Sequence, residues 1–374
     1  MTQECTDGHR VGIQPHTGRR PYLDYLRAGA TLSVICGHVV ALAASMLPPY
    51  SPSYRILELF RFVFTISNMV FLMISGALLL PVQGERAGTF YRKRFLKVAV
   101  PMVICYLLYV CAKEGFLWLR PDHWIPMLRR ILAGPPEEAP HFWLVYAILG
   151  LYVLTPFLRW IVHNIPDTVF YGVMAVVFLV CGLDTYLPLL GVPSPFTAVT
   201  GSFAGVFLLG YFLADRCGRC AEGVFFAAGI VSLAVSFALI FTTDNYYSYL
   251  FLNAPTMLFC ASAVFLGVKR LCGGMRSTPR PVAFLGRYSY SVLLIHWGVM
   301  HVAVKRILRV DVLSGGIWGG CLLMIVLTAA GSMAGAVAFD RLLILPLQRG
   351  AACIWSGLCR IGRALFLKKE KPEE

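Results

Sequence analysis

The sequence predicts an all-α fold: a polytopic transmembrane helical bundle of about ten spans, with both termini in the cytoplasm. Of its 374 residues, 58% are hydrophobic and only 14% are charged, whereas soluble domains contain about 25% charged residues. Apolar runs long enough to cross a bilayer recur along the chain. Lysine and arginine gather in alternate connections between these runs, as they do in multi-pass membrane proteins.

The apolar runs define the expected spans, because a transmembrane helix needs about 20 predominantly apolar residues. Two runs in the middle of the chain are marginal, so a count of nine or eleven spans stays open. The expected spans are residues 23–46, 57–80, 95–112, 141–162, 168–187, 197–214, 222–241, 250–271, 283–302 and 317–339.

The distribution of positive charge sets the orientation. With the N-terminus in the cytoplasm, about 22 lysines and arginines fall on the inner side and about eight on the outer side. The net charge of +14 therefore follows membrane orientation. It favours membrane lipids as partners and argues against nucleic acid.

Three segments are expected. Residues 1–20 form a polar cytoplasmic segment without a signal peptide, and residues 21–340 form the transmembrane domain. Residues 341–374 form a basic tail whose apolar and cationic residues suggest an amphipathic helix on the inner leaflet. Residues 113–140 make the largest outer connection, which we expect to pack at the membrane interface.

The first span carries Asp24, Arg27 and His38 within an otherwise apolar run. At 100° per residue all three lie on nearly the same helical face, with His38 about 16 Å beyond Arg27. An ionisable residue at membrane depth costs about 2.5–3.5 kcal/mol on insertion scales, so such residues usually face protein or an aqueous path. This stripe is either a functional site or a structural polar seam between helices.

Cationic residues gather at the inner end of the third span, where Arg92, Lys93, Arg94 and Lys97 lie within two helical turns. Such a cluster suits a phosphate-rich ligand, because arginine binds phosphate oxygens in a bidentate manner. The alternative is ordinary positive-inside charge in contact with lipid phosphates.

Histidines and cysteines differ in what they predict. His38 and His296 lie within spans, and His141 opens the fourth span from the outer side. Intramembrane histidines either bond a neighbouring helix or take part in chemistry. The twelve cysteines are scattered, and the one CxxC pair, Cys217 and Cys220, has no second pair or histidine cluster beside it, so no metal site is expected.

Arg27 and His38 form an R-x10-H pattern that resembles the first span of the acyltransferase-3 family of integral membrane acyltransferases. Later segments resemble motifs of that family in the same order, and the second of them is similar to the surface-polysaccharide O-acetyltransferase branch. These segments are FLMISGALLL at 71–80, HFWLVYAILGLYVLTPFLR at 141–159, GYFL at 210–213 and SYSVLLIH at 289–296. The chain departs from the family where Lys97 replaces the second arginine of R-x-x-R, and at residues 65–68, where many relatives have a proline.

The resemblance implies a membrane O-acyltransferase of the bacterial cytoplasmic membrane. It implies transfer of an acyl group, most often acetyl, from cytoplasmic acyl-coenzyme A to a hydroxyl of an extracytoplasmic glycan or its lipid-linked precursor. Acyl-coenzyme A is a co-substrate, and no permanently bound cofactor is expected. His38 would act as the general base and Asp24 would hold Arg27 in place. Arg27, Arg92, Arg94 and Lys97 would bind the donor.

Several questions stay open from the sequence. Ser75, His141 and His296 are candidates to line the transfer site, and both direct transfer and an acyl-enzyme route are compatible with the residues. A carrier or flippase for a polar solute or lipid-linked sugar is the rival class, although paired half-helices in two repeats are not evident. The sequence is silent on the acyl group, the acceptor and the oligomeric state. Polar outer residues expected to shape acceptor choice are Glu137, Glu138, Asp184, Asp244, Asn245, Tyr246 and Tyr247.

Overall fold

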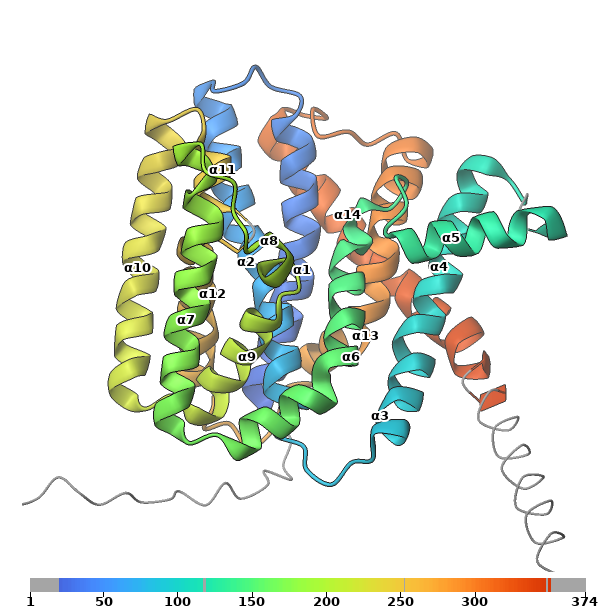
Figure 1. Ribbon diagram of the computed structural model, residues 1–374. Helices are drawn as coiled ribbons and strands as arrows, with labels where there is room; N and C mark the ends of the chain where they lie inside the picture. The colour runs from blue at the N-terminus through green and yellow to red at the C-terminus, as the bar shows by residue number, and fades with distance from the viewer. Residues whose placement is uncertain (1–19, 117–118, 252, 348, 351–374) are drawn as a thin grey trace, which may run out of the picture.

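The computed structural model describes residues 20–350 except 117, 118, 252 and 348, and this part of the chain is helical without strands (Figure 1). Residues 1–19 and the greater part of the predicted amphipathic tail, from 351 onward, lie outside the described residues. The α-helices are α1 (Pro21–Ala44), α2 (Pro52–Leu79), α3 (Ala87–Arg94), α4 (Val100–Glu114), α5 (Trp124–Ala133), α6 (Trp143–Asn164), α7 (Asp167–Tyr186), α8 (Thr197–Thr200), α9 (Ala204–Tyr211), α10 (Arg219–Thr242), α11 (Tyr246–Leu250), α12 (Pro255–Cys272), α13 (Arg280–Gly298) and α14 (Ile317–Phe339).

Shorter helical segments extend or precede several of these helices. The π-helical ones are η1 (Phe95–Ala99), η6 (Phe212–Arg216), η7 (Val299–Ile307) and η8 (Asp340–Ile344), and the 3-10 ones are η3 (Pro121–His123), η4 (Pro140–Phe142) and η5 (Pro188–Leu190). Because η1 joins α3 to α4, the third span begins at Ala87 and includes the whole predicted cationic cluster.

Eight helices of the described chain are long and apolar enough to cross a membrane, which confirms the polytopic all-α bundle. The ninth expected span corresponds to α13 continued by η7, a helix of 19 and 9 residues. The sixth expected span does not form one continuous helix. The described chain begins and ends on the same side of the bundle (Figure 1); we call this side inner, following the charge distribution.

The sixth span is broken between α8 and α9. Phe203 adopts a left-handed backbone with φ of 55°, and the Ser202 hydroxyl accepts a hydrogen bond from the amide of Ala204 at 3.3 Å, a local turn just before α9. The expectation of a helix through residues 197–214 is therefore wrong. This run was one of the two marginal ones, but hydropathy does not locate a backbone turn within it.

Two glycines set the contact between α2 and α9. A Cβ on Gly76 would lie 1.8 Å from the carbonyl oxygen of Phe207, and a Cβ on Gly210 would lie 2.0 Å from that of Met73. The two backbones therefore touch directly, as small residues allow between membrane helices. The glycines of the segments at 71–80 and 210–213 thus have a packing role.

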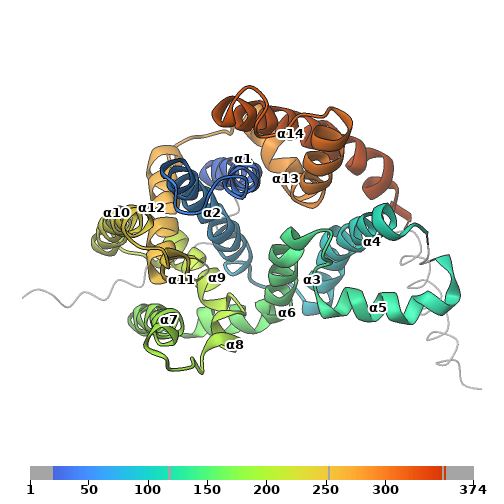
Figure 2. The same cartoon turned by 90° about the horizontal axis from the view of Figure 1, so that it is seen from above.

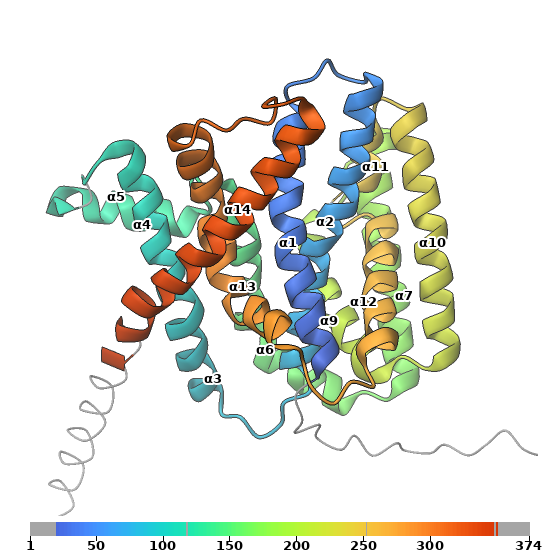
Figure 3. The same cartoon turned by 180° about the vertical axis from the view of Figure 1, so that it is seen from behind.

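Helix α1 contacts α2, α12, α13 and α14. The view from above shows it beside these helices (Figure 2), and the view from behind shows α14 crossing beside it (Figure 3). Its residues Leu23, Ile35 and Val39 are fully or almost fully buried. Of the polar stripe, Asp24 is buried and Arg27 and His38 are partly buried, and all three face neighbouring helices or the spaces between them.

The largest outer connection carries α5, which exposes Trp124, Ile125, Leu128 and Leu132. It lies across the outer end of α4 (Figure 1). Its other side is fastened to the bundle, because the hydroxyl of Tyr146 donates a hydrogen bond to the Ile131 carbonyl at 2.6 Å. An apolar face of this kind suits a position at the membrane interface.

Candidate active site

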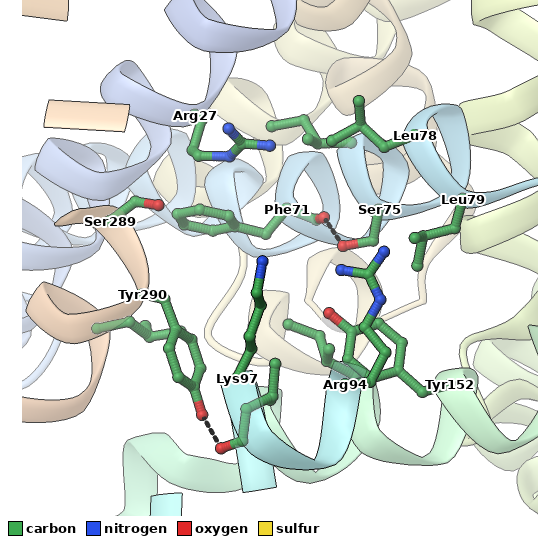
Figure 4. Close-up of a pocket in the computed structure, with 14 residues that line it drawn as sticks. Arg27, Phe71, Ser75, Leu78, Leu79, Arg94, Lys97, Tyr152, Ser289 and Tyr290 are labelled. Carbon is green, nitrogen blue, oxygen red and sulfur yellow. Dashed lines mark hydrogen bonds between the residues drawn. The ribbon is translucent and has the colours of Figure 1, made fainter. Parts of the chain in front are cut away.

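A cationic cavity of about 460 Å³ lies among α1, α2, the α3–η1 helix, α6 and α13. Arg27 enters it from α1, Arg94 from α3 and Lys97 from η1, and Figure 4 shows their charged ends directed toward the region beside Phe71 and Ser75. The other lining residues are Ile74, Leu78, Leu79, Val98, Ile148, Tyr152, Ser289, Tyr290 and Leu293. Three of the four predicted donor-binding cations therefore meet around one space.

Aromatic and backbone contacts position these cations. The Arg94 guanidinium lies over the rings of Phe90 and Tyr152, at 5.4 and 5.6 Å from their centroids. The Tyr290 hydroxyl donates to the Val98 carbonyl at 2.6 Å (Figure 4), which ties α13 to the π-helical turn that carries Lys97. A π-helical turn next to a site is a frequent feature of functional helices.

Asp24 lies behind Arg27, away from the cavity lining. Its Oδ1 is 3.7 Å from Nη1 of Arg27, and its Oδ2 accepts a hydrogen bond from the Thr278 hydroxyl at 2.8 Å. The carboxylate is thus placed to orient the guanidinium. Arg92, by contrast, is exposed and is not among the cavity-lining residues.

Three histidines from different spans meet beyond the cavity on the outer side; we call His38, His141 and His296 the histidine cluster. The ring centroids of His38 and His296 are 5.2 Å apart, those of His141 and His296 are 4.8 Å apart, and those of His38 and His141 are 6.3 Å apart. The indole of Trp297 lies 5.2 Å from His38 and 5.6 Å from His141. Within the described residues no group of histidine, cysteine or acidic side chains is arranged to hold a metal.

Backbone contacts define the proton positions on His296. Its Nδ1 lies 2.9 Å from the Leu293 carbonyl and 3.1 Å from that of Val292. Because carbonyl oxygens only accept hydrogen bonds, Nδ1 carries the proton and Nε2 of the neutral ring is an acceptor. Nε2 is buried and has no hydrogen-bond partner among the described residues.

His141 is held by the same helix. Its Nε2 lies 3.4 Å from the Leu294 carbonyl, and its Nδ1 is buried without a partner among the residues described. The Tyr109 hydroxyl also donates to the Leu294 carbonyl, at 3.0 Å, and accepts from the amide of Gly298 at 2.9 Å. Tyr109 thus joins α4 to α13 where the latter passes into its π-helical extension.

The cavity and the cluster follow one another along α13. Ser289 and Leu293 line the cavity and His296 belongs to the cluster, so positions i, i+4 and i+7 lie on one helical face. His296 is about 4.5 Å further along the axis than Leu293. Ser75 lines the cavity and donates to the Phe71 carbonyl at 3.0 Å, so the structure groups it with the cations and not with the histidines.

A buried ion pair on α2 was not anticipated from the sequence. Glu58 is 1% exposed, and its Oε1 accepts a hydrogen bond from Arg61 at 2.7 Å. Arg61 and His38 line a common pocket of about 110 Å³, together with Thr65, Ser67 and Asn68. The signal was present in the sequence, since an acid and an arginine three residues apart within a predicted span repeat the pattern of Asp24 and Arg27.

The comparison with known proteins agrees with this geometry. A family model described as an acyltransferase domain matches residues 20–339, a range that includes the cationic cavity and the histidine cluster. No curated protein and no solved structure gives a significant match. The matched range covers most of the 374 residues, so the chain belongs to the acyltransferase-3 family and is a multi-pass membrane acyltransferase.

Proposed function

We propose that this acyltransferase moves an acetyl group from cytoplasmic acetyl-coenzyme A to a hydroxyl of an extracytoplasmic glycan or its lipid-linked precursor, in the bacterial cytoplasmic membrane. The observation that carries the proposal is the sequence of sites along α13: a cationic cavity on the inner side, followed one helical turn later by the histidine cluster. A donor that is charged at one end and reactive at the other matches this arrangement.

The donor's phosphates belong at the cationic cavity. Arg27, Arg94 and Lys97 supply three positive charges around it, and charge-assisted hydrogen bonds to phosphate are about twice as strong as neutral ones. The pantetheine arm then extends toward the outer side. Arg27 and His38 are separated by about 16 Å along α1, a span that an extended pantetheine arm bridges.

His38 acts as the general base in this scheme. It takes the proton of the acceptor hydroxyl while the oxygen attacks the thioester carbonyl carbon, so a C–O bond forms and the C–S bond breaks. The coenzyme A thiolate leaves and receives the proton back from His38, which returns to its neutral state. Histidine suits this task because it titrates near neutral pH.

His141 and His296 have a different part. In its neutral form His296 offers an acceptor nitrogen, because its proton is engaged with the backbone carbonyls of α13. It therefore positions the neighbouring His38 ring and does not donate to an oxyanion.

The hydroxyl of Ser75 lies at the cavity, where it contacts the pantetheine arm. Direct transfer is the simplest route through this geometry, and an acyl-enzyme would reveal itself as protein-bound label in a single turnover.

Substitution of His38 tests the assignment. In inverted membrane vesicles supplied with labelled acetyl-coenzyme A, the His38→Ala protein is expected to lose incorporation of label into glycan by roughly 10²- to 10⁴-fold, with donor affinity unchanged. His123→Ala, in the outer connection, is the matched control and should retain wild-type incorporation. Wild-type incorporation by a correctly inserted His38→Ala protein would exclude His38 as the base.

A further inference from the structure

A second cavity, of about 530 Å³, lies in the outer half of the bundle between α7, α8 and α11. It is lined by an aromatic pair, a carboxylate, an amide and hydroxyl groups, contributed by Tyr247, Phe251, Asp184, Asn253, Ser248 and Thr200. None of these residues belongs to the cationic cavity or the histidine cluster. We call this space the outer cavity.

The aromatic pair forms one wall of the outer cavity. The rings of Tyr247 and Phe251 are stacked, with centroids 4.4 Å apart and an angle of 16° between their planes. Tyr247 is 49% exposed and Phe251 is 6% exposed, so the tyrosine ring presents the accessible surface. A flat apolar surface of this kind packs against the C–H face of a pyranose ring, while the sugar hydroxyls at the ring edge require polar partners.

Polar groups suited to such hydroxyls lie in the same cavity. One oxygen of Asp184 accepts a hydrogen bond from Thr197 at 2.8 Å, and the other accepts from Thr200. Ser194 also hydrogen-bonds this carboxylate. An ionised carboxylate has about four acceptor positions, so Asp184 is oriented by these hydroxyls and keeps a position for a ligand hydroxyl.

Asn253 supplies a second acceptor. Its Nδ2 donates to the Thr200 carbonyl at 2.8 Å. The side chain is 8% exposed, and its Oδ1 has no hydrogen-bond partner in the described part of the chain. An unsatisfied buried acceptor is unfavourable, so a hydroxyl donor that reached this oxygen from the outer cavity would stabilise the site.

The outer cavity adjoins the histidine cluster through one residue. The Arg61 guanidinium lies 5.2 Å from the Tyr247 ring and 5.1 Å from the Phe251 ring. Arg61 also lines the small pocket that contains His38. Glu58 holds Arg61 at 2.7 Å and accepts a second hydrogen bond, at 2.9 Å, from Tyr246, on the same short helix as Tyr247.

We propose that the outer cavity is the acceptor subsite and that it binds a neutral sugar ring. Tyr247, backed by Phe251, stacks against the ring, and Asp184 and Asn253 accept hydrogen bonds from its hydroxyls. A neutral sugar is favoured over an acidic one because Asp184 is anionic. The position of the sugar relative to His38 rests on the proposed function, whereas sugar binding itself does not.

Saturation-transfer NMR with the purified full-length protein tests the binding. The protein is placed in phospholipid nanodiscs without glycosidic detergent, and the probes are cellobiose and its uronic acid counterpart. We expect signals from cellobiose, and at least tenfold weaker binding in Asp184→Asn, since a hydrogen bond to a charged group contributes about 1.5–3 kcal/mol. Tyr247→Ala should also lose the signal. Asp184→Asn is nearly isosteric, so the test holds even if Tyr247→Ala does not fold.

Two matched controls lie outside the cavity. Asp122→Asn changes an exposed outer carboxylate that pairs with Arg120, and Phe237→Ala removes an exposed ring from α10. Both should bind cellobiose as the wild type does. Absence of cellobiose binding by the wild type, preferential binding of the acidic probe, or equal losses in the controls would overturn the proposal.

A parallel assay separates this proposal from the proposed function. Release of coenzyme A from acetyl-coenzyme A, with water as the acceptor, should be unchanged in Asp184→Asn, because the donor site is intact. If release fell together with cellobiose binding, the cavity would not be a separate acceptor subsite. If neither the wild type nor any variant consumed acetyl-coenzyme A while cellobiose still bound at this cavity, the acetyl-donor proposal would be wrong. The proposal of a sugar-binding site would still hold.

Discussion

The cationic cavity and the histidine cluster lie on consecutive turns of α13, but they consist of different kinds of side chain. The cavity is lined by three cations from three helical segments, and one of them, Lys97, is exposed. The cluster consists of imidazole rings, of which His141 is 3% and His296 is 0% exposed. Cations thus line the cavity near the inner surface, and imidazole rings lie deeper in the bundle.

This difference separates two tasks that one reaction needs. Binding a phosphate-rich donor requires fixed charge, which is cheapest where the helix ends reach the membrane surface. Moving a proton requires groups that change protonation state in an enclosed space. We therefore expect substitutions in the two regions to affect different kinetic quantities: donor affinity for the cavity, and the rate at saturating donor for the cluster.

The first test of this division of tasks removes one cation from the cavity. Arg94→Gln should weaken donor binding by roughly 10- to 150-fold, because a hydrogen bond to a charged group contributes about 1.5–3 kcal/mol. The rate at saturating donor should stay close to that of the wild type. Titration with acetyl-coenzyme A, together with kcat and KM, measures both quantities.

Arg92→Gln is the control for that substitution, since Arg92 lies two positions earlier and is exposed outside the cavity lining. We expect little change in donor affinity. Equal losses in both variants would indicate general surface charge in place of a built phosphate site. A fall in kcat alone for Arg94→Gln would contradict the separation of tasks.

The contact between α2 and α9 supports both regions, so disturbing it should affect them together. Gly210→Ala would place a methyl group 2.0 Å from the carbonyl oxygen of Met73, and overpacking of this kind costs about 1–3 kcal/mol. The thermal unfolding temperature in nanodiscs should fall, with donor binding and transfer declining in proportion to the folded fraction. A Cβ on Gly223 would have no neighbour within 4 Å, so Gly223→Ala should unfold like the wild type. An equal fall in unfolding temperature for Gly223→Ala would show that the contact between α2 and α9 is not the cause of the loss.

The sequence predicted the parts of the site that follow from helical geometry. Arg94 and Lys97 are close in sequence on one helix, and the structure directs both to one cavity. The stripe on α1 was predictable for the same reason, because periodicity alone places Arg27 and His38 on one face. The eight long apolar helices follow from hydropathy.

The remaining features depend on contacts between distant segments. His38, His141 and His296 were separate candidates in the sequence, and only the packing of α1, η4 and α13 brings their rings together. The break at Phe203 and the junction between Arg61 and the aromatic pair are likewise tertiary features. Hydropathy describes which segments enter the membrane, and it does not describe which of them touch.

The smallest expected effect concerns the inner rim of the cationic cavity, at Glu85. This carboxylate accepts hydrogen bonds from Lys93 at 2.9 Å and from Arg159 at 3.1 Å. Arg159 also donates to the Leu79 carbonyl at 2.7 Å and lies 4.8 Å from the Phe90 ring, on which Arg94 is stacked. Partial burial acts to raise the pKa of Glu85, but the hydrogen bonds and charges of Lys93 and Arg159 outweigh it and lower that pKa.

The sign of the pH dependence follows from this lowered pKa. Because the folded-state pKa lies below the unfolded value of about 4.3, the stabilisation is complete above about pH 4.3 and is lost as the pH falls through the folded-state pKa. Glu85→Gln should therefore lower the unfolding temperature at pH 7 by an amount matching about 0.2–1 kcal/mol, and the difference should shrink below about pH 4. Glu137→Gln, at a carboxylate that is 91% exposed, should show a smaller difference at pH 7.

A difference for Glu85→Gln that persisted at acid pH would show that the charge of Glu85 does not stabilise the inner rim. A loss of transfer rate without loss of donor affinity would place this rim with the histidine cluster, against the division of tasks between the two regions.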